Sequence, residues 1–160
     1  MTVEINDTAP NFNAPTDGEG NINLGDLKGQ AFILYFYPKD STPGCTTESC
    51  DFRDSHPEFE KLDIKIFGVS KDSVKRHDNF KAKHGFPFAL ISDESGEICE
   101  AYGVWVLKKL YGREYMGIER TTFLVDKNGK INHIWRKVKV KGHVEEVLKQ
   151  AQLLSDEIAA

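Results

Sequence analysis

Residues 32–50 read FILYFYPKDSTPGCTTESC, in which six apolar or aromatic side chains are followed by a segment with two cysteines. The unbroken run Phe32–Tyr37 predicts a strand buried on both faces, and Pro38 ends it because proline cannot donate to a sheet ladder. Thr42-Pro43-Gly44 then predicts a helix start. We expect this helix to run from Thr42 to Leu62.

Strands and helices alternate along the rest of the chain. The expected strands are Ile64–Val69, Phe88–Ile91, Thr121–Val125 and Ile131–Arg136, the last two flanking the hairpin signal Asn128-Gly129. The expected helices run from Asp72 or Ser73 to about His84, from Gly96 to Tyr102 and from Gly142 to Leu154. This order predicts an α/β, thioredoxin-like fold with an N-terminal extension. Its central mixed β-sheet, flanked by helices, has parallel strands from the first half and an antiparallel hairpin at the edge.

Length and composition predict a single domain spanning residues 1–160. A chain of 160 residues with 39% hydrophobic side chains can bury one sizeable core without disulfides. Three cysteines are too few for a secreted disulfide scaffold, and Met1–Asp7 has neither the basic nor the apolar part of a leader, so we expect a cytoplasmic protein. The longest apolar run, Ala31–Tyr37, is far shorter than the roughly 20 residues of a spanning helix, so we expect no membrane association.

Charge patterning argues against nucleic-acid binding. The net charge is −4, and the one basic stretch, Lys130–Lys141, alternates lysine with valine near its end, which predicts a strand with one exposed face. The five histidines are scattered among charged residues without metal-ligand spacing, so we expect them on the solvated surface: His56, His77, His84, His133 and His143.

Cys45 is the candidate nucleophile, because a cysteine at a helix N-terminus lies where backbone N–H groups stabilise a thiolate. Cys50 follows five residues later. On a regular helix that spacing separates the two Cα atoms by roughly 8 to 9 Å. A disulfide tolerates at most about 7 Å. A bond between Cys45 and Cys50 therefore requires the first turns of the helix to unwind, which favours a redox switch over a permanent crosslink.

The chain resembles the peroxiredoxins, and specifically the bacterioferritin comigratory protein or peroxiredoxin Q branch. The resemblance rests first on Phe36-Tyr37-Pro38 followed by Thr42-Pro43-Gly44-Cys45-Thr46 and Cys50. It extends over most of the chain through Ala9–Phe12, Gly68–Ser70, Leu90–Asp93, Tyr102–Trp105 and Arg120–Asp126.

This resemblance implies a thiol peroxidase of antioxidant defence that acts as a monomer. The Cys45 thiolate would attack hydrogen peroxide or an organic hydroperoxide, and Cys50 would condense with the resulting sulfenic acid to form a disulfide. Thioredoxin would be the reductant, and no metal or other cofactor is required. Arg120 would supply the cation beside Cys45, Thr42 would hold the peroxide or the sulfur, and Pro38 would wall the pocket against water. Taken singly, these last three residues are also typical of a surface cation, a helix cap and a strand end.

Three other classes remain open from the residues alone. A general disulfide oxidoreductase shares the fold but normally has two residues between its cysteines, and here there are four. A copper-binding protein of this fold would add a distant histidine to the cysteine pair. A binding or holdase module with an incidental redox pair would leave Thr42 and Arg120 dispensable. The third cysteine, Cys99, is expected to be a small buried hydrophobe.

Overall fold

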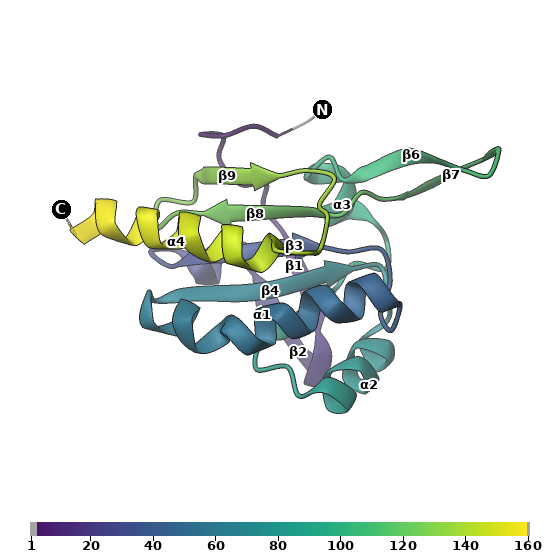
Figure 1. The fold of residues 1–160 in the computed structure, drawn as a ribbon, viewed down its shortest axis with the longest axis horizontal. Coiled ribbons are helices and arrows are strands. Elements are labelled where there is room, and N and C mark those ends of the chain that lie inside the picture. The colour runs from purple at the N-terminus through teal and green to yellow at the C-terminus, as the bar shows by residue number, and fades with distance from the viewer. Residues whose placement is uncertain (1–2, 160) are drawn as a thin grey trace.

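The computed structural model describes residues 3–159, so Met1, Thr2 and Ala160 of the expected domain lie outside the described residues. A seven-stranded mixed sheet has the strand order β2-β1-β5-β4-β3-β8-β9 (Figure 1). Its strands are β1 Asn13–Thr16, β2 Gly20–Asn23, β3 Ala31–Phe36, β4 Ile64–Ser70, β5 Ala89–Ser92, β8 Thr121–Val125 and β9 Ile131–Trp135. A separate two-stranded hairpin consists of β6 Trp105–Leu110 and β7 Arg113–Ile118.

Four α-helices flank the sheet. They are α1 Pro43–Lys61, α2 Val74–His84, α3 Glu97–Ala101 and α4 His143–Ala159, and short 3-10 turns span Asp17–Glu19 and Leu24–Leu27. Helices α1 and α4 contact each other and lie side by side over one face of the sheet (Figure 1). The β6–β7 hairpin projects away from the body of the molecule at the opposite end from the C-terminus (Figure 1).

Strand β3 supplies side chains to two separate cores. Phe32, Leu34 and Phe36 pack into one cluster, together with Tyr102 after α3. The alternate residues Ala31, Ile33 and Tyr35 pack into the cluster formed with α1 and α4. Successive side chains of a strand point to opposite faces of the sheet. A strand with only apolar side chains is therefore fully buried only if both faces of the sheet are covered.

Helix α1 is anchored to its core mainly by aromatic side chains in its later turns. Phe52 and Phe59 are fully buried, and the Phe52 ring stacks on Tyr35 with 4.6 Å between centroids. The residues buried in the first two turns are small or polar, namely Cys45, Glu48 and Ser49. The helix therefore makes its large apolar contacts in its later turns, whereas its N-terminal turns are held by small and polar side chains.

The predicted mixed sheet is confirmed. β3 pairs parallel with β4, and β4 pairs parallel with β5. β8 and β9 pair antiparallel around a turn in which Gly129 has a φ of 76°. The helix predicted from Thr42 to Leu62 is observed as Pro43–Lys61, with Thr42 as its N-cap residue.

Two parts of the sequence reading are incomplete or wrong. The strands β1 and β2 and the whole β6–β7 hairpin were not predicted, and that hairpin turns at Tyr111 and Gly112, both with positive φ, without an Asn-Gly signal. The lysine–valine alternation before Lys141 does not form a strand. Lys137 has a φ of 49°, which breaks the extended backbone, and Val138 N–H donates to the Arg120 carbonyl over 3.0 Å.

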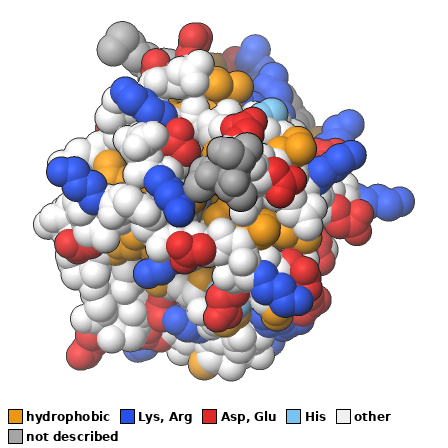
Figure 2. Space-filling view, turned by 90° about the vertical axis from the view of Figure 1, so that its left-hand side faces the viewer, with side chains coloured by type: hydrophobic (Ala, Val, Ile, Leu, Met, Phe, Trp, Pro, Cys, Tyr) orange, Lys and Arg blue, Asp and Glu red, His pale blue; other side chains and the backbone are white. Residues whose placement is uncertain are grey.

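Acidic and basic side chains are interspersed on the face at the C-terminal end of α4, with apolar atoms exposed only in small groups between them (Figure 2). Within residues 3–159, none of the helices combines the length and the apolar character needed to cross a membrane.

Candidate active site

Cys45 lies in the first turn of α1, the helix that follows strand β3 after a short loop. Its side chain is 1% exposed. Pro43 occupies the first turn, where no intrahelical N–H is needed, and the Thr46 N–H closes the first helical bond onto the Thr42 carbonyl at 2.8 Å. The helix therefore starts where the sequence predicted, and the Cys45 sulfur is buried at the N-terminus, the positive end of the helix dipole.

Arg120 reaches Cys45 across 75 residues of sequence. It lies between β7 and β8, and its Nη2 donates to Cys45 Sγ at 3.3 Å. The backbone of Arg120 is held in turn by the hydrogen bond that its carbonyl accepts from Val138. The fold thus brings a fixed cation to the buried sulfur, as the resemblance implied.

Gly44 leaves the space through which the Arg120 guanidinium approaches. A Cβ atom built on Gly44 would lie 3.2 Å from Arg120 Nη2. This separation is tighter than ordinary van der Waals contact. A side chain at position 44 would therefore press on the guanidinium, which would have to shift by a few tenths of an ångström.

Glu48 is the second partner of Arg120 and was not predicted from the sequence. Arg120 Nη1 donates to Glu48 Oε1 at 2.7 Å, and the Glu48 side chain is completely buried. Burial raises the pKa of Glu48 to about 7, although the charge and hydrogen bond of Arg120 act in the opposite direction. Its position three residues after Cys45 places it on the same face of α1, and that spacing was the available signal.

His143 closes the cluster behind Glu48. Within the described part of the chain, Glu48 Oε2 has no hydrogen-bond partner, and it lies 3.9 Å from His143 Nε2. That nitrogen pairs with Thr122 Oγ1 at 2.8 Å. Burial, followed by the nearby charge of Arg120, lowers the pKa of His143 to about 4, so the imidazole is neutral at neutral pH.

The expectation that all five histidines lie on the solvated surface is wrong for His77 and His143. Their side chains are 0% and 3% exposed. His77 Nδ1 lies 2.6 Å from Asp40 Oδ2, and its Nε2 lies 2.9 Å from the Ile91 carbonyl. Charged neighbours in sequence did not reveal this burial because α2 turns one face, with His77 and Phe80, to the core.

Asp40 ties the loop before α1 to the body of the protein. Its carboxylate accepts a hydrogen bond from the Tyr37 hydroxyl at 2.5 Å, besides the contact with His77, and its backbone N–H donates to Asp72 Oδ2 at 2.8 Å. Asp40, Asp72 and His77 bring their ligand atoms within 4.8 Å of one another. Asp40 and His77 contact each other, and Asp72 accepts from the Asp40 backbone N–H, so the cluster holds the loop at Asp40.

Thr42 and Pro38 lie in the segment between β3 and Cys45, where Pro38 is exposed and Thr42 is half-buried. The Thr42 hydroxyl donates to the Lys39 carbonyl at 2.9 Å, which leaves its oxygen lone pairs free to accept. Pro38 lies at the rim of a cavity of about 390 Å³ between this loop and the β6–β7 hairpin. The other residues lining that cavity are Lys39, Lys71, Trp105, Lys108, Tyr115, Met116, Gly117 and Ile118.

The other two cysteines lie apart from Arg120. Cys50 is on the same helix as Cys45 and is partly exposed, and its Sγ lies 3.9 Å from His84 Nδ1. Cys99 is fully buried in α3, which confirms the prediction of a small buried side chain, and burial raises its pKa strongly. All three cysteines are free thiols in this structure.

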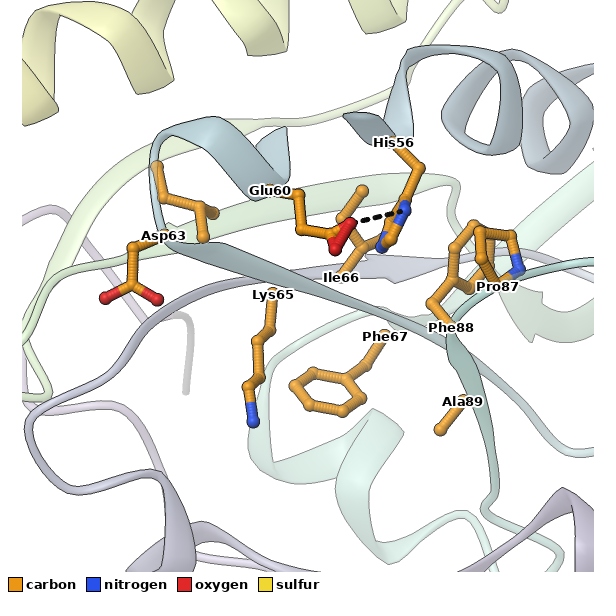
Figure 3. Close-up of a pocket in the computed structure, with 10 residues that line it drawn as sticks. His56, Glu60, Asp63, Lys65, Ile66, Phe67, Pro87, Phe88 and Ala89 are labelled. Atoms are coloured by element: carbon orange, nitrogen blue, oxygen red, sulfur yellow. Dashed lines mark ion pairs between the residues drawn. The ribbon is translucent and has the colours of Figure 1, made fainter. Parts of the chain in front are cut away.

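A cavity of about 320 Å³ lies at the far end of α1, between that helix and the strands β4 and β5 (Figure 3). His56 and Glu60 of α1 form an ion pair of 3.7 Å at the cavity, and Phe67 lies across from them on β4 (Figure 3). Phe88 lies near His56, with 6.5 Å between the ring centroids. None of its lining residues belongs to the group around Cys45.

Comparisons with known proteins identify the family of the chain. The model of the AhpC/TSA family matches residues 5–134. The chain is 53% identical to Peroxiredoxin Bcp of Bacillus subtilis over 156 residues, which covers 98% of this chain and 99% of that protein. It is also similar to two solved structures. Xylella fastidiosa PrxQ matches with a TM-score of 0.91 at 42% identity, covering 96% of this chain and 98% of that chain.

The second structure is the Xanthomonas campestris Bacterioferritin Comigratory Protein, studied for its alkyl peroxide reduction activity. It matches with a TM-score of 0.86 at 46% identity, covering 90% of this chain and 92% of that chain. Both neighbours have the mixed sheet flanked by helices of the thioredoxin-like fold, so the predicted fold class is confirmed.

Proposed function

The chain belongs to the AhpC/TSA family and is a peroxiredoxin of the Bcp/PrxQ branch, and from this we propose that it reduces hydroperoxides through a sulfenic acid on Cys45. The observation that carries the proposal is the contact of 3.3 Å between Arg120 Nη2 and the buried Sγ of Cys45. A peroxidatic sulfur must react as a thiolate, and a fixed guanidinium at a helix N-terminus stabilises that anion.

In the proposed first step the Cys45 thiolate attacks one peroxide oxygen. The S–O bond forms, the O–O bond breaks, and the leaving oxygen takes up a proton to become water or an alcohol. Negative charge grows on that oxygen, and the donors of the Arg120 guanidinium are close enough to share it. Thr42 would hold the peroxide through its exposed hydroxyl, and Pro38 would limit the access of water.

The proposed second step joins Cys50 to the oxidised Cys45. Both residues belong to the same continuous helix, so their Cα atoms are roughly 8 to 9 Å apart and the N-terminal turns must unwind. The absence of large apolar side chains among the buried residues Cys45, Glu48 and Ser49 supports this step. A dithiol reductant, which we propose to be thioredoxin, then restores both thiols by exchange.

Hydrogen peroxide and organic hydroperoxides are the proposed substrates. The alkyl peroxide reduction studied in the Xanthomonas campestris relative supports the organic class. The cavity beside Pro38, with Trp105 and Met116 in its lining, offers an apolar surface for the organic group. We further propose that residues 1–160 form one domain and work as a cytoplasmic monomer in antioxidant defence, since both cysteines of the cycle lie in one chain.

One equivalent of hydrogen peroxide, followed by peptide mass mapping, tests the cycle. We expect a Cys45–Cys50 crosslink in the wild-type protein, no peroxide consumption by Cys45→Ser, and one equivalent consumed by Cys50→Ser before it stalls. Arg120→Lys should lose at least about tenfold in peroxidase rate, because one ammonium cannot serve both Glu48 and Cys45. Normal turnover of Cys50→Ser with thioredoxin would show that Cys50 is not the resolving residue.

A further inference from the structure

His84 places a ring nitrogen that can accept a proton beside the Cys50 sulfur. Nδ1 of His84 lies 3.9 Å from Cys50 Sγ, within the longer reach of a hydrogen bond to sulfur. The two residues are 34 apart in sequence and come from different helices, α1 and α2. The sequence alone gave no reason to pair them.

The His84 ring is held in place on both sides. The Phe80 ring meets it edge to face with 5.3 Å between centroids, and Phe86 stacks on it at 5.5 Å. Arg53 of α1 donates from Nη1 to the His84 carbonyl at 2.8 Å, which fixes the end of α2 against α1. The imidazole therefore has a fixed orientation, with Nδ1 toward the sulfur, while the residue remains partly open to solvent.

The protonation states of the pair suit proton transfer. Burial, with the nearby charges of Lys83 and Arg53, lowers the pKa of His84, so its ring is neutral at neutral pH. Burial raises the pKa of the Cys50 thiol, with Arg53 opposing and Asp54 and Asp51 adding to the rise. A thiol of this kind holds only a small fraction of thiolate near pH 7 and needs a base to become a nucleophile.

We propose that His84 is the general base of the resolving step, a role that rests on the proposed function of Cys50. With the ring proton on Nε2, Nδ1 accepts the Cys50 proton. The Cys50 sulfur attacks the sulfur of the Cys45 sulfenic acid as the helix unwinds, the S–S bond forms and the S–O bond breaks. The hydroxide leaves as water with the proton returned from the imidazolium. Cys50 is oxidised as Cys45 is reduced, and no other oxidant is consumed.

Single-turnover kinetics separate this role from the first step. Sulfenic acid on Cys45 is followed by trapping with dimedone, and the disulfide by rapid thiol alkylation and mass spectrometry. In His84→Gln we expect an unchanged rate of sulfenic acid formation and a disulfide rate reduced at least about tenfold at pH 7. His56→Gln is the matched control, because His56 lies on α1 and pairs with Glu60.

The pH profile distinguishes a base from a structural side chain. In the wild-type protein the disulfide rate should already be level at about pH 6.5, the ordinary pKa of histidine, because the pKa of His84 is lowered below it. In His84→Gln it should continue to rise toward pH 9 as the free thiol ionises. Imidazole in the buffer should restore the rate of His84→Ala at pH 7. Without a base, the slower resolution should also leave Cys45 more sensitive to a second peroxide.

Wild-type disulfide kinetics in His84→Gln, with the wild-type pH profile, would overturn the role of His84 and leave that of Cys50 intact. A faster disulfide rate at every pH, or the absence of rescue of His84→Ala by imidazole, would also overturn it, since either shows that the ring acts by packing. Failure of the wild-type protein to form any Cys45–Cys50 bond would instead contradict the proposed function.

Discussion

Asp40 and His77 form a buried pair with 2.6 Å between Oδ2 and Nδ1, and this pair joins the loop before Cys45 to helix α2. The Ile91 carbonyl lies 2.9 Å from the other ring nitrogen, so that nitrogen carries a proton. Hydrogen bonding at both nitrogens favours the imidazolium. Burial lowers the pKa of His77, but the hydrogen bond and charge of Asp40 outweigh it and the pKa is raised.

Asp40→Asn should destabilise the protein and change its pH dependence. Removing one partner of a buried pair costs about 3–5 kcal/mol. Because the folded-state pKa of His77 is raised, its contribution to stability is complete below about pH 6.5 and is lost as the pH rises through the folded value. Urea unfolding at pH 6, 7 and 8 should show a cost of Asp40→Asn that shrinks with rising pH. A cost independent of pH would mean that His77 is not charged in the folded protein.

Gly44→Ala should slow peroxide reduction while leaving the fold intact. The new Cβ would lie 3.2 Å from Arg120 Nη2, so the guanidinium would have to shift by a few tenths of an ångström from its position beside Cys45. We expect a second-order rate constant with hydrogen peroxide at least about tenfold lower, measured by stopped flow, because small displacements of a charged group are costly at a reacting centre. Gly25→Ala, whose Cβ would meet Asn23 Oδ1 at 3.5 Å, is the control and should keep the full rate.

Glu48→Gln should become more favourable to stability as the pH rises. The pKa of Glu48 is raised from 4.5 to about 7 in the folded protein, so ionising it opposes folding, and this penalty develops between those two values. Relative to the wild-type protein, the unfolding free energy of Glu48→Gln should increase by roughly 3 kcal/mol between pH 4 and pH 8. The measurement is urea denaturation of both proteins across that range. A constant difference would show that Glu48 ionises normally.

Trp105→Ala should separate large from small substrates. Trp105 lines the cavity beside Pro38, and Lys71 Nζ lies 4.2 Å from the centroid of its ring. Losing this apolar surface should raise the KM for cumene hydroperoxide several-fold and leave the rate with hydrogen peroxide within about twofold, because a small peroxide does not need the cavity. Equal losses with both peroxides would place the organic group elsewhere.

The sequence predicted those parts of the fold that depend on local patterns. Phe32–Tyr37 and Ile64–Val69 are apolar runs that only a covered sheet can bury, and Thr42-Pro43-Gly44 places a helix start by backbone chemistry. These elements were found within one or two residues of their observed bounds. The β6–β7 hairpin was missed because its strands are largely exposed and its Tyr111-Gly112 turn lacks the usual signal.

Candidate site residues could be named from the sequence only where they belong to a recognisable motif. Cys45, Thr42 and Pro38 are close in sequence, and Arg120 was named through the family resemblance. For Glu48 the three-residue spacing from Cys45 was the available signal, whereas His77 and His143 have no sequence neighbour that marks them. The burial of all three results from α1, α2 and α4 packing against the sheet. Glu48, His77 and His143 are of residue types that are usually exposed, and only the packing of the helices on the sheet makes them interior groups.

Because its large apolar side chains lie in its later turns, α1 can unwind at its N-terminus without unfolding the rest of the protein. Phe52 and Phe59 hold the helix, whereas the turns containing both cysteines bury only small or polar groups. Opening those turns breaks the contacts of Glu48 with Arg120 and of Ser49 with Tyr35 but exposes little apolar surface, so it is a local opening that leaves the rest of the core packed. Backbone amides between Cys45 and Cys50 should exchange with deuterium far faster than those after Phe52. A heat-resistant version of this enzyme could therefore retain its full cycling rate.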